Sequence, residues 1–315
     1  IMLVKKHLPK NEIHLSTQAN ATNIEAVKFW AKMGVKRVVL AREVSLEEIC
    51  EIKKAVPKME LEYFIHGAMC MSYSGRCILS KWMNNRSANL GDCTQPCRWK
   101  YKKVESEILE MGVVDDRGRF EIDLEEDQHG TYFFNSRDMN LSAHIQDLVD
   151  AGVDSLKIEG RAKSVYYVAT VVRAYRQIID ALNAKNLKQV IKQQQKELDT
   201  LVNRGYSKGF LLGSEPEHNF EGKLSATDFK FVGQIEGQQK IEGKIFNVVF
   251  MHNEMFLKDD LEAIDPKGNA KVKIKKILNH KMEEVEEAHG GHGKRFFVQF
   301  SKILPEQALL RRKLK

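Results

Sequence analysis

The sequence predicts an α/β protein with a parallel sheet, followed by a small β-rich domain. Two patterns in the 315-residue chain support this prediction. In the first half, short apolar runs alternate with amphipathic helical stretches, which is typical of βαβ units. From about Ser214 onward, short β-rich runs follow one another with turn residues between them, which is typical of a small β-barrel.

The first half begins with Ile1–Pro9, which has the pattern of a helix tail entering a turn. Helical stretches such as Asn23–Met33 and Ser45–Val56 then lie between several of the apolar runs. The expected strands are Ile13–Thr17, Val35–Leu40, Leu61–His66, Thr131–Asn135 and Ser155–Glu159. Five strands do not close a barrel, so we expect an exposed sheet edge.

The stretch Arg98–Gly130 interrupts this alternation. Lys102–Met111 and Phe120–Leu124 flank the turn signal Asp115–Gly118, which predicts a β-hairpin insertion at about residues 98–130. Ten acids against two arginines in residues 105–127 make the insertion acidic. The insertion either covers the preceding cysteines, contacts a partner, or is a solvent-exposed addition with an acidic face.

The sequence predicts an amphipathic helix at Val165–Leu182 and a polar helix at Lys185–Val202. The polar helix is expected to be a solvent-exposed connector. We therefore expect three parts, namely an α/β domain over 1–183, a helical connector over 184–213 and a β-rich domain over 214–315. The strands expected in the last part are Phe229–Ile235, Lys240–Val249, Met255–Ile264, Lys271–Leu278 and Arg295–Phe300.

Composition sets limits on the compartment and the partner. With 43% hydrophobic residues the chain can bury a sizeable core, yet its longest apolar runs are too short to span a bilayer. We expect a cytoplasmic protein with no membrane partner. The net charge of +7 is compatible with a polyanionic partner and also with an ordinary basic surface.

Four of the five cysteines, Cys70, Cys77, Cys93 and Cys97, fall within 28 residues. A reducing cytosol argues against disulfides, and four thiolates are the usual ligand set of a structural zinc or an iron–sulfur cluster. Their spacing matches neither a zinc ribbon nor a ferredoxin run. The sequence therefore predicts a metal centre without deciding which metal, and leaves Cys50 outside it.

Residues 60–80 resemble the signature of the U32 peptidase (collagenase-like protease) family, E-x-F-x2-G-[SA]-[LIVM]-C-x4-G-x-C-x-[LIVM]-S. The residues at its fixed positions are Glu62, Phe64, Gly67, Ala68, Met69, Cys70, Gly75, Cys77, Leu79 and Ser80. The resemblance extends through Cys93–Arg98, Asn135–Asp138, Lys157–Arg161 and Asn203–Phe210. It covers nearly the whole chain and is weakest over the last ninety residues.

The resemblance implies an incomplete (β/α)8 TIM-like barrel followed by a small C-terminal β-barrel domain. About three early βα units would precede the equivalent of Ile1. The resemblance also favours a 4Fe–4S cluster over zinc, because some family members that hydroxylate RNA or quinone precursors use such clusters. Some relatives take the fourth ligand from a distant cysteine, whereas here Cys97 is needed to complete the set.

Polar side chains at the carboxyl ends of barrel strands form a second predicted group, because active sites of this fold are built there. We interpret His66, Glu43 and Glu159 as candidate proton-transfer residues. The candidate substrate-binding residues are Gln18, Asn20, Arg42, Asn85, Arg86, Arg137 and Arg161. The alternative is that these groups form salt bridges with one another across the barrel mouth.

Lysines are frequent in the C-terminal part, with four in Lys271–Lys276. We predict that Lys273 and Lys275 contact RNA phosphates. A charged surface without a partner is the alternative.

Three functions follow as hypotheses. The chain has neither a His-Glu-x-x-His helix nor a Gly-x-Ser-x-Gly elbow. Within the family it is most similar to the tRNA-hydroxylation branch, which implies oxygen-independent formation of 5-hydroxyuridine at the wobble position of tRNA, with prephenate as co-substrate. A collagenase-like peptidase, with Cys70 and His66 as nucleophile pair, is the first alternative. A noncatalytic RNA-binding protein with structural zinc is the second.

Overall fold

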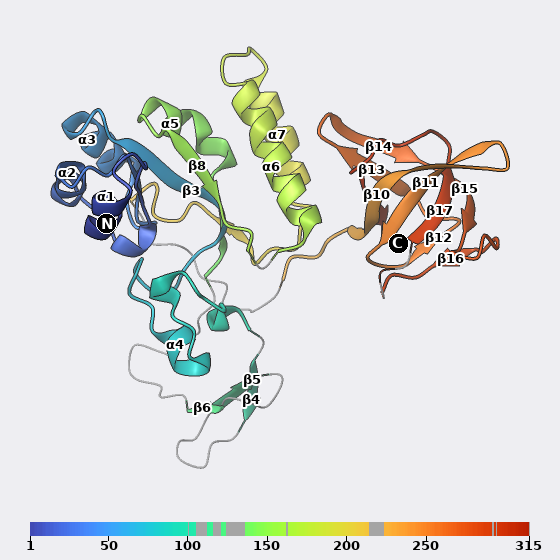
Figure 1. Ribbon diagram of the computed structural model, residues 1–315, viewed down its shortest axis with the longest axis horizontal. Coiled ribbons are helices and arrows are strands. Elements are labelled where there is room, and N and C mark those ends of the chain that lie inside the picture. The colour runs from blue at the N-terminus through green and yellow to red at the C-terminus, as the bar shows by residue number, and fades with distance from the viewer. Residues whose placement is uncertain are drawn as a thin grey trace. The chain divides into compact units, whose positions relative to one another are not determined.

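The computed structural model describes residues 1–99, 101–104, 112–115, 121–123, 136–161, 163–213, 224–291, 293 and 295–314. The chain divides into two compact units (Figure 1). Unit 1 comprises Ile1–Arg161, Ile178–Leu187 and Asn203–Leu224, and unit 2 comprises Ala162–Gln177, Lys188–Val202 and Ser225–Lys315. The domain boundaries expected after residues 183 and 213 stay a prediction.

Unit 1 contains a mixed sheet with the strand order β1-β2-β3-β7-β9, in which β8 also pairs with β3. Its strands are β1 (His14–Leu15), β2 (Arg37–Val39), β3 (Glu60–Ala68), β7 (Asp138–Asn140), β8 (Ser155–Ile158) and β9 (Tyr206–Ser207). The pairs β1–β2, β2–β3, β3–β8 and β7–β9 are parallel, whereas β3–β7 is antiparallel. The long strand β3 therefore organises the sheet.

Four of the five strands expected in the first half are present as β1, β2, β3 and β8. The fifth, Thr131–Asn135, lies outside the described residues. The described strands form a mixed sheet in which β7 runs antiparallel to β3. An α/β architecture is thus confirmed, and the TIM-like barrel is not.

The helices of unit 1 are α1 (Met2–His7), α2 (Ile24–Lys32), α3 (Leu46–Ala55), α4 (Leu79–Asn84) and α5 (Ile145–Asp150), with 3₁₀ turns at Thr17–Ala19, Ala88–Leu90, Pro96–Arg98 and Ser142–His144. Two of them, α2 and α3, begin at a side-chain cap that the sequence provides. The Asn23 side chain accepts a hydrogen bond from the N–H of Ala26, and Ser45 and Glu48 form a capping box. Such caps satisfy backbone donors that the first helical turn leaves free.

The two faces of β3 differ in character. Leu61, Tyr63 and Ile65 point to one face and are at most 1% exposed, whereas Glu60 and Glu62 alternate with them on the other. Period-two alternation is typical of a strand with one apolar face. The apolar face of β3 belongs to the core of unit 1, and its carboxylates form ion pairs on the opposite face.

The predicted hairpin insertion contains a small three-stranded antiparallel sheet. Its strands are β4 (Tyr101–Val104), β5 (Gly112–Asp115) and β6 (Glu121–Asp123), paired in the order β4-β5-β6. The strand expected over Lys102–Met111 is present in its described part as β4, and residues 105–111 and 116–120 lie outside the described part of the chain.

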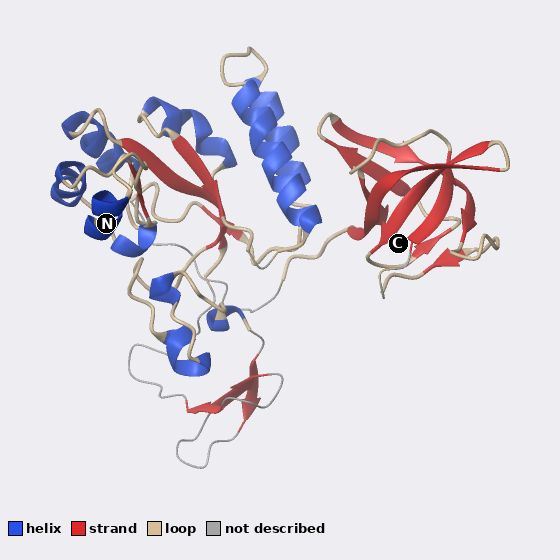
Figure 2. Ribbon diagram, viewed as in Figure 1, coloured by secondary structure: helices blue, strands red, loops and turns tan. Residues whose placement is uncertain are grey.

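Unit 2 contains most of α6 (Val165–Asp180), α7 (Leu187–Leu198) and the C-terminal strands, which Figure 2 shows in red. The strands are β10 (Phe229–Ile241), β11 (Lys244–Met251), β12 (Met255–Phe256), β13 (Leu261–Asp265), β14 (Gly268–Val272), β15 (Ile274–Leu278), β16 (Glu287–Ala288), β17 (Arg295–Phe300) and β18 (Leu309–Lys313). The β-rich C-terminal part is therefore confirmed.

Seven of these strands pair in the order β14-β13-β18-β10-β11-β17-β15. The strands at the two ends of this order, β14 and β15, are consecutive in the chain and are separated by Lys273 alone, so the sheet curls back on itself. Inside it lies a core that includes Val232, Val249, Val298 and Leu310, each fully buried.

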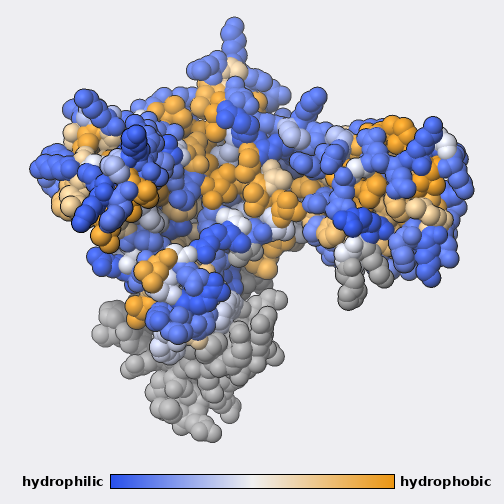
Figure 3. Space-filling model, viewed as in Figure 1, coloured by the Kyte–Doolittle hydropathy of each residue, from blue (hydrophilic) through white to orange (hydrophobic). Residues whose placement is uncertain are grey.

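Figure 3 shows hydrophilic side chains over much of the visible face of both units, with hydrophobic groups between them. Within the described residues, no helix is long and apolar enough to cross a membrane.

Candidate functional site

The four clustered cysteines lie on one long loop of unit 1. The loop, here called the cysteine loop, runs from Met69 at the end of β3 to Arg98, just before β4, and contains α4 and two 3₁₀ turns. All five cysteines of the chain are free thiols, and Cys50 lies apart from the others on α3. The loop contains little regular secondary structure, so side-chain contacts must hold it in place.

The thiols of the loop influence one another electrostatically. Burial raises the pKa of Cys93, and the neighbouring Cys70 and Cys77 raise it further. Burial likewise raises the pKa of Cys97 to about 11, with Arg98 lowering it and the other three thiols of the loop adding to the increase. Each of the four is thus close enough to another to affect its ionisation, although 15 residues separate Cys77 from Cys93.

The donor chemistry of this set fits a thiophilic metal centre. Four neighbouring thiols cannot all ionise without a cation, and a zinc ion or iron–sulfur cluster supplies the compensating charge. The geometry is less complete, because among the described residues no three Cys, His, Asp or Glu side chains converge as a ligand group. Binding would therefore have to draw the loop together, as metal binding commonly does.

The first half of the cysteine loop is anchored through Ser74. The two carboxylate oxygens of Glu43 accept hydrogen bonds from the backbone N–H of Ser74 at 2.7 Å and from its hydroxyl at 3.0 Å. Asn20 Nδ2 donates to the carbonyl of Ser74 at 2.7 Å. Glu43 and Asn20 follow strands β2 and β1, so the carboxyl ends of these two strands hold the loop.

Two signature glycines permit close backbone approaches at this point. Gly75 has a φ of +74°, and a Cβ there would lie 2.0 Å from the carbonyl oxygen of Gln18. Gly67 has a φ of +110°, and a Cβ there would lie 2.3 Å from the carbonyl oxygen of Glu159. Both positions need a left-handed backbone and leave no room for a side chain, which only glycine provides.

Ser80, the last signature residue, ties the two halves of the loop together. It is fully buried, its hydroxyl lies 3.1 Å from that of Thr94 and it accepts from the backbone N–H of Thr94. Asn84 Nδ2 also donates to the Thr94 hydroxyl at 2.6 Å. These bonds join α4, which follows Cys77, to the residue after Cys93.

A buried ion pair holds the two ends of the loop. Arg98 Nη1 lies 2.6 Å from Asp138 Oδ1, and Arg98 Nη2 donates to the carbonyl of Met69 at 2.9 Å. The carboxylate is 1% exposed. Arg204 donates to the carbonyl of Arg98 at 2.6 Å. One guanidinium therefore fixes the residue before Cys70 and the residue after Cys97 to strand β7.

The polar face of the sheet carries further charges. The guanidinium of Arg42 stacks 3.8 Å from the ring centroid of Phe64, within the range of a cation–π contact. Beside it, Glu62 accepts from Lys157 at 2.8 Å and from Ser155 at 2.8 Å. His66, which is 1% exposed, lies on β3 beyond Glu62 and Phe64, and its ring centroid is 5.5 Å from that of Tyr206.

The arginines predicted to bind substrate lie in different settings. Arg161 Nη1 donates to the carbonyl of Gly91 within the cysteine loop at 2.6 Å, and its backbone N–H donates to Glu159 Oε1 at 3.1 Å. Arg86 pairs with Asp92 on the surface. The side chain of Arg137 passes close to Gly205.

The structure thus places the predicted residues in three groups. Gln18, Asn20, Glu43 and Arg161 contact the cysteine loop, and Asn85 and Arg86 belong to it. Arg42, His66, Arg137 and Glu159 lie at or beside the sheet of unit 1, whereas Lys273 and Lys275 are exposed in unit 2.

Ser74, Thr94 and Arg98 were not predicted as site residues, although they hold the loop together with Asp138, which was expected only as a polar residue at a strand end. Arg98 follows a cysteine directly and Asp138 falls within a stretch resembling the family, so both carried a signal. Ser74 occupies a variable position of the signature and carried none.

Comparison with known proteins identifies two matching regions. Residues 1–221 match the model of "Peptidase family U32", and residues 227–311 match that of "Peptidase family U32 C-terminal domain".

Three curated relatives are similar over most of the chain. The "tRNA hydroxylation protein P" of Haemophilus influenzae is 40% identical over 93% of this chain and 71% of its own length. The protein of the same name from Escherichia coli is 40% identical over 92% of this chain and 70% of its own length. The "Collagenase" of Porphyromonas gingivalis is 31% identical over 95% of this chain and 72% of its own length.

Proposed function

This chain belongs to peptidase family U32, and we propose that within the family it is an RNA hydroxylase that acts on transfer RNA. The observation that carries the proposal is the 40% identity, over 93% of the chain, to a protein named for tRNA hydroxylation. The collagenase relative covers as much of the chain at 31% identity. The difference favours the RNA-modifying branch of the family.

The finer proposal concerns the reaction. The substrate would be uridine at the wobble position, the product 5-hydroxyuridine, and prephenate the co-substrate. Replacing a C–H bond by C–OH removes two electrons from the base and adds one oxygen atom, so the proposed reaction requires a two-electron acceptor and an oxygen donor besides the uridine. The cysteine loop is the part of unit 1 with redox-capable ligands.

We propose that Cys70, Cys77, Cys93 and Cys97 hold a 4Fe–4S cluster, with zinc as the alternative. An iron–sulfur cluster supplies electron transfer when bound. Two observations support the assignment, namely the effect of neighbouring thiols of the loop on the pKa values of Cys93 and Cys97, and the anchoring of both ends of the loop. A structural zinc in the same ligands would instead fit a noncatalytic RNA-binding protein.

The chain's own residues then have distinct tasks. Because both oxygens of Glu43 are bonded to Ser74, Glu43 positions the cysteine loop. His66 and Glu159 remain as proton-transfer candidates at the end of β3 and just after β8. Arg161 reaches the loop and carries a charge for an anionic substrate group, and we assign Arg42, Asn85, Arg86 and Arg137 to substrate binding alongside it.

The collagenase-like peptidase is the second candidate, and the collagenase relative is the observation in its favour. Its chemistry would need a free thiolate nucleophile. Cys70 is exposed, but a thiolate committed to a metal cannot also attack a peptide bond. The two functions therefore make opposite demands on the same sulfur.

The test is a gene deletion followed by mass spectrometry of nucleosides from bulk tRNA. We expect the deletion to remove one hydroxylated uridine and leave gelatin turnover unchanged. The intact gene should restore the nucleoside, Cys77→Ala should not, and Cys50→Ala should restore it fully. Protein purified without oxygen should contain about four irons. An unchanged tRNA profile, with gelatin cleavage that requires Cys70, would instead establish the peptidase.

A further inference from the structure

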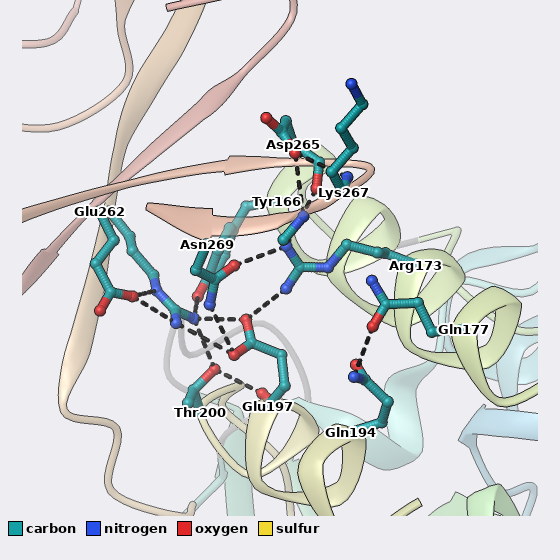
Figure 4. A network of polar contacts seen from close by, with 12 residues as sticks. Tyr166, Arg173, Gln177, Gln194, Glu197, Thr200, Glu262, Asp265, Lys267 and Asn269 are labelled. Atoms are coloured by element: carbon teal, nitrogen blue, oxygen red, sulfur yellow. Dashed lines mark hydrogen bonds and ion pairs between the residues drawn. The ribbon is translucent and has the colours of Figure 1, made fainter. Parts of the chain in front are cut away.

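Unit 2 contains a buried polar network that joins its helices to its sheet (Figure 4). Glu197 near the end of α7 accepts from Arg173 of α6 at 2.9 Å and from Arg311 of β18 at 2.9 Å. Arg173 also donates to Asn269 Oδ1 on β14 at 2.6 Å, and Asn269 Nδ2 donates to Glu197 Oε2 at 3.0 Å. The last turn of α7 is thereby fixed against β14.

A row of lysines begins beside this junction. Along β14 and β15, Val272 and Ile277 belong to the core and Ile274 packs against it. Up to the register shift between Ile274 and Lys276, every second residue of this segment is exposed, namely Asn269, Lys271, Lys273 and Lys275. Alternate residues of a strand lie about 6.8 Å apart. Lys271 is therefore the next outward side chain after Asn269, the residue bonded to α7.

A second row of lysines runs along α7. Lys188, Lys192 and Lys196 are exposed, and their spacing of four residues places them on one side of the helix, about 6 Å apart along its axis. Lys196 immediately precedes Glu197, which is bonded to Asn269. Across the described part of unit 2, the ammonium groups of both rows have no ion-pair partner.

We propose that these two rows form one surface that binds the phosphate backbone of an RNA. The six lysines of α7 and β14–β15 belong to one compact unit, and the Glu197–Asn269 bonds bring the end of one row to the start of the other. Two lines of positive charge at 6–7 Å intervals complement a polyanion whose charges repeat along its chain. Lysine contacts of this kind provide affinity and orientation rather than sequence selectivity.

The proposal deepens the assignment to transfer RNA and rests on it for the identity of the RNA. Its test is binding of bulk tRNA to the full chain at several salt concentrations. In one variant Lys188, Lys192 and Lys196 become Gln, which keeps helix propensity. In the other, Lys271, Lys273 and Lys275 become Thr, which suits a strand. We expect each variant to lower the slope of log affinity against log salt by about 2 to 3.

The matched control replaces Lys240 and Lys244, which are exposed beside the β10–β11 turn; β13 and β18 lie between β14 and β10 in the sheet order. This control should leave the slope unchanged, and thermal unfolding should show that all variants fold. If the α7 variant kept the slope of log affinity against log salt of the unchanged chain, the proposal that both rows form one RNA-binding surface would be wrong. Binding of the full chain to anionic phospholipid vesicles but not to tRNA would also overturn it. Binding through both rows without any hydroxylated nucleoside in the tRNA would keep the surface and reject the proposed reaction.

Discussion

Both units bury charged side chains, but they use them differently. In unit 1, the single carboxylate of Asp138 pairs with Arg98 and holds the two ends of the cysteine loop. In unit 2, Arg311, 2% exposed, pairs with Glu197 and Glu262 and stacks 4.0 Å from the ring of Phe229. The first network positions the cysteine loop, which carries four thiols, and the second joins the helices of unit 2 to its sheet.

A buried ion pair has different consequences in the two units because its surroundings differ. The sheet of unit 2 has a continuous apolar core, so its ion pairs add to a structure that packs already. The cysteine loop has little regular structure, and its position depends on Ser74, Ser80 and Arg98. Segments with few buried apolar contacts open locally at lower free energy than a packed core.

The largest effect on stability is expected from Arg311→Met. The change removes the arginine that pairs with Glu262 and one of the two arginines that pair with Glu197, in a largely buried site. Breaking a buried pair in this way costs about 3–5 kcal/mol. Far-UV circular dichroism during thermal unfolding should show the transition of unit 2 at a clearly lower temperature.

The two units can be followed separately in this experiment because the three tryptophans, Trp30, Trp82 and Trp99, all lie in unit 1. Tryptophan fluorescence should therefore report an unchanged transition in the Arg311 variant. Arg295→Gln, which removes an exposed pair with Glu236, is the control and should shift neither signal by more than about 1 kcal/mol. A fluorescence transition that moves with Arg311 would show that the units unfold together.

The next largest effect is expected from Asp138→Asn. Arg98 then keeps only neutral acceptors in a mostly buried position, which costs about 3 kcal/mol. The tryptophan-detected transition should fall. If the four cysteines hold a cluster, iron bound per chain should fall as well, because both ends of the loop are released.

Asp92→Asn is the matched control for Asp138, since the Arg86–Asp92 pair lies on the same loop with both side chains about half exposed. It should change stability by no more than about 1 kcal/mol and leave the iron content intact. Iron loss of the same size in both variants would show that the loop responds to any lost charge, and the positioning role of Asp138 would be rejected.

The smallest effect is expected from acid titration of Glu254. Hydrogen bonds from Lys230 and Arg312, at 2.5 Å and 2.7 Å, stabilise its carboxylate, and the Lys230 bond is the main cause of a pKa lowered to about 2. Since the folded-state pKa lies below the ordinary value of 4.5, this contribution is present above about pH 4.5 and is lost as the pH falls towards 2.

Denaturant midpoints followed by circular dichroism at pH 6, 4 and 3 measure this contribution. Glu254→Gln should reduce the decline in stability between pH 4.5 and 3 by about 1 kcal/mol or less, as expected for a surface pair. An identical pH dependence in the variant would assign the acid sensitivity of unit 2 to other carboxylates.

Local patterns predicted most elements because their causes are local. The caps at Asn23 and Ser45 mark the starts of α2 and α3, and apolar runs mark β1, β2, β3 and β8. The antiparallel strand β7 was missed, because three residues carry too little periodicity to be recognised. The incomplete TIM-like barrel was expected from the family resemblance, and pairing between distant strands is not encoded in any one of them.

The candidate site divides in the same way. The clustering of four thiols, Cys70, Cys77, Cys93 and Cys97, predicted a metal centre from the sequence alone. The sequence did not indicate that Glu43 bonds to Ser74, which is 31 residues away, or that Arg98 bonds to Asp138, which is 40 residues away. A carboxylate at the end of a strand fits catalysis and anchoring equally well until its partner is known.

By itself, the sequence determined the chemistry available to this protein, because thiols, carboxylates and lysines are properties of residues. Its signature glycines also determined where the backbone adopts left-handed conformations, since φ preferences are local. Only the tertiary structure decided which of these groups act together. It joined the end of α7, which carries Lys196, to β14, which carries Lys271, through Glu197 and Asn269, residues 72 positions apart, because burying charged groups requires partners that only a folded chain supplies.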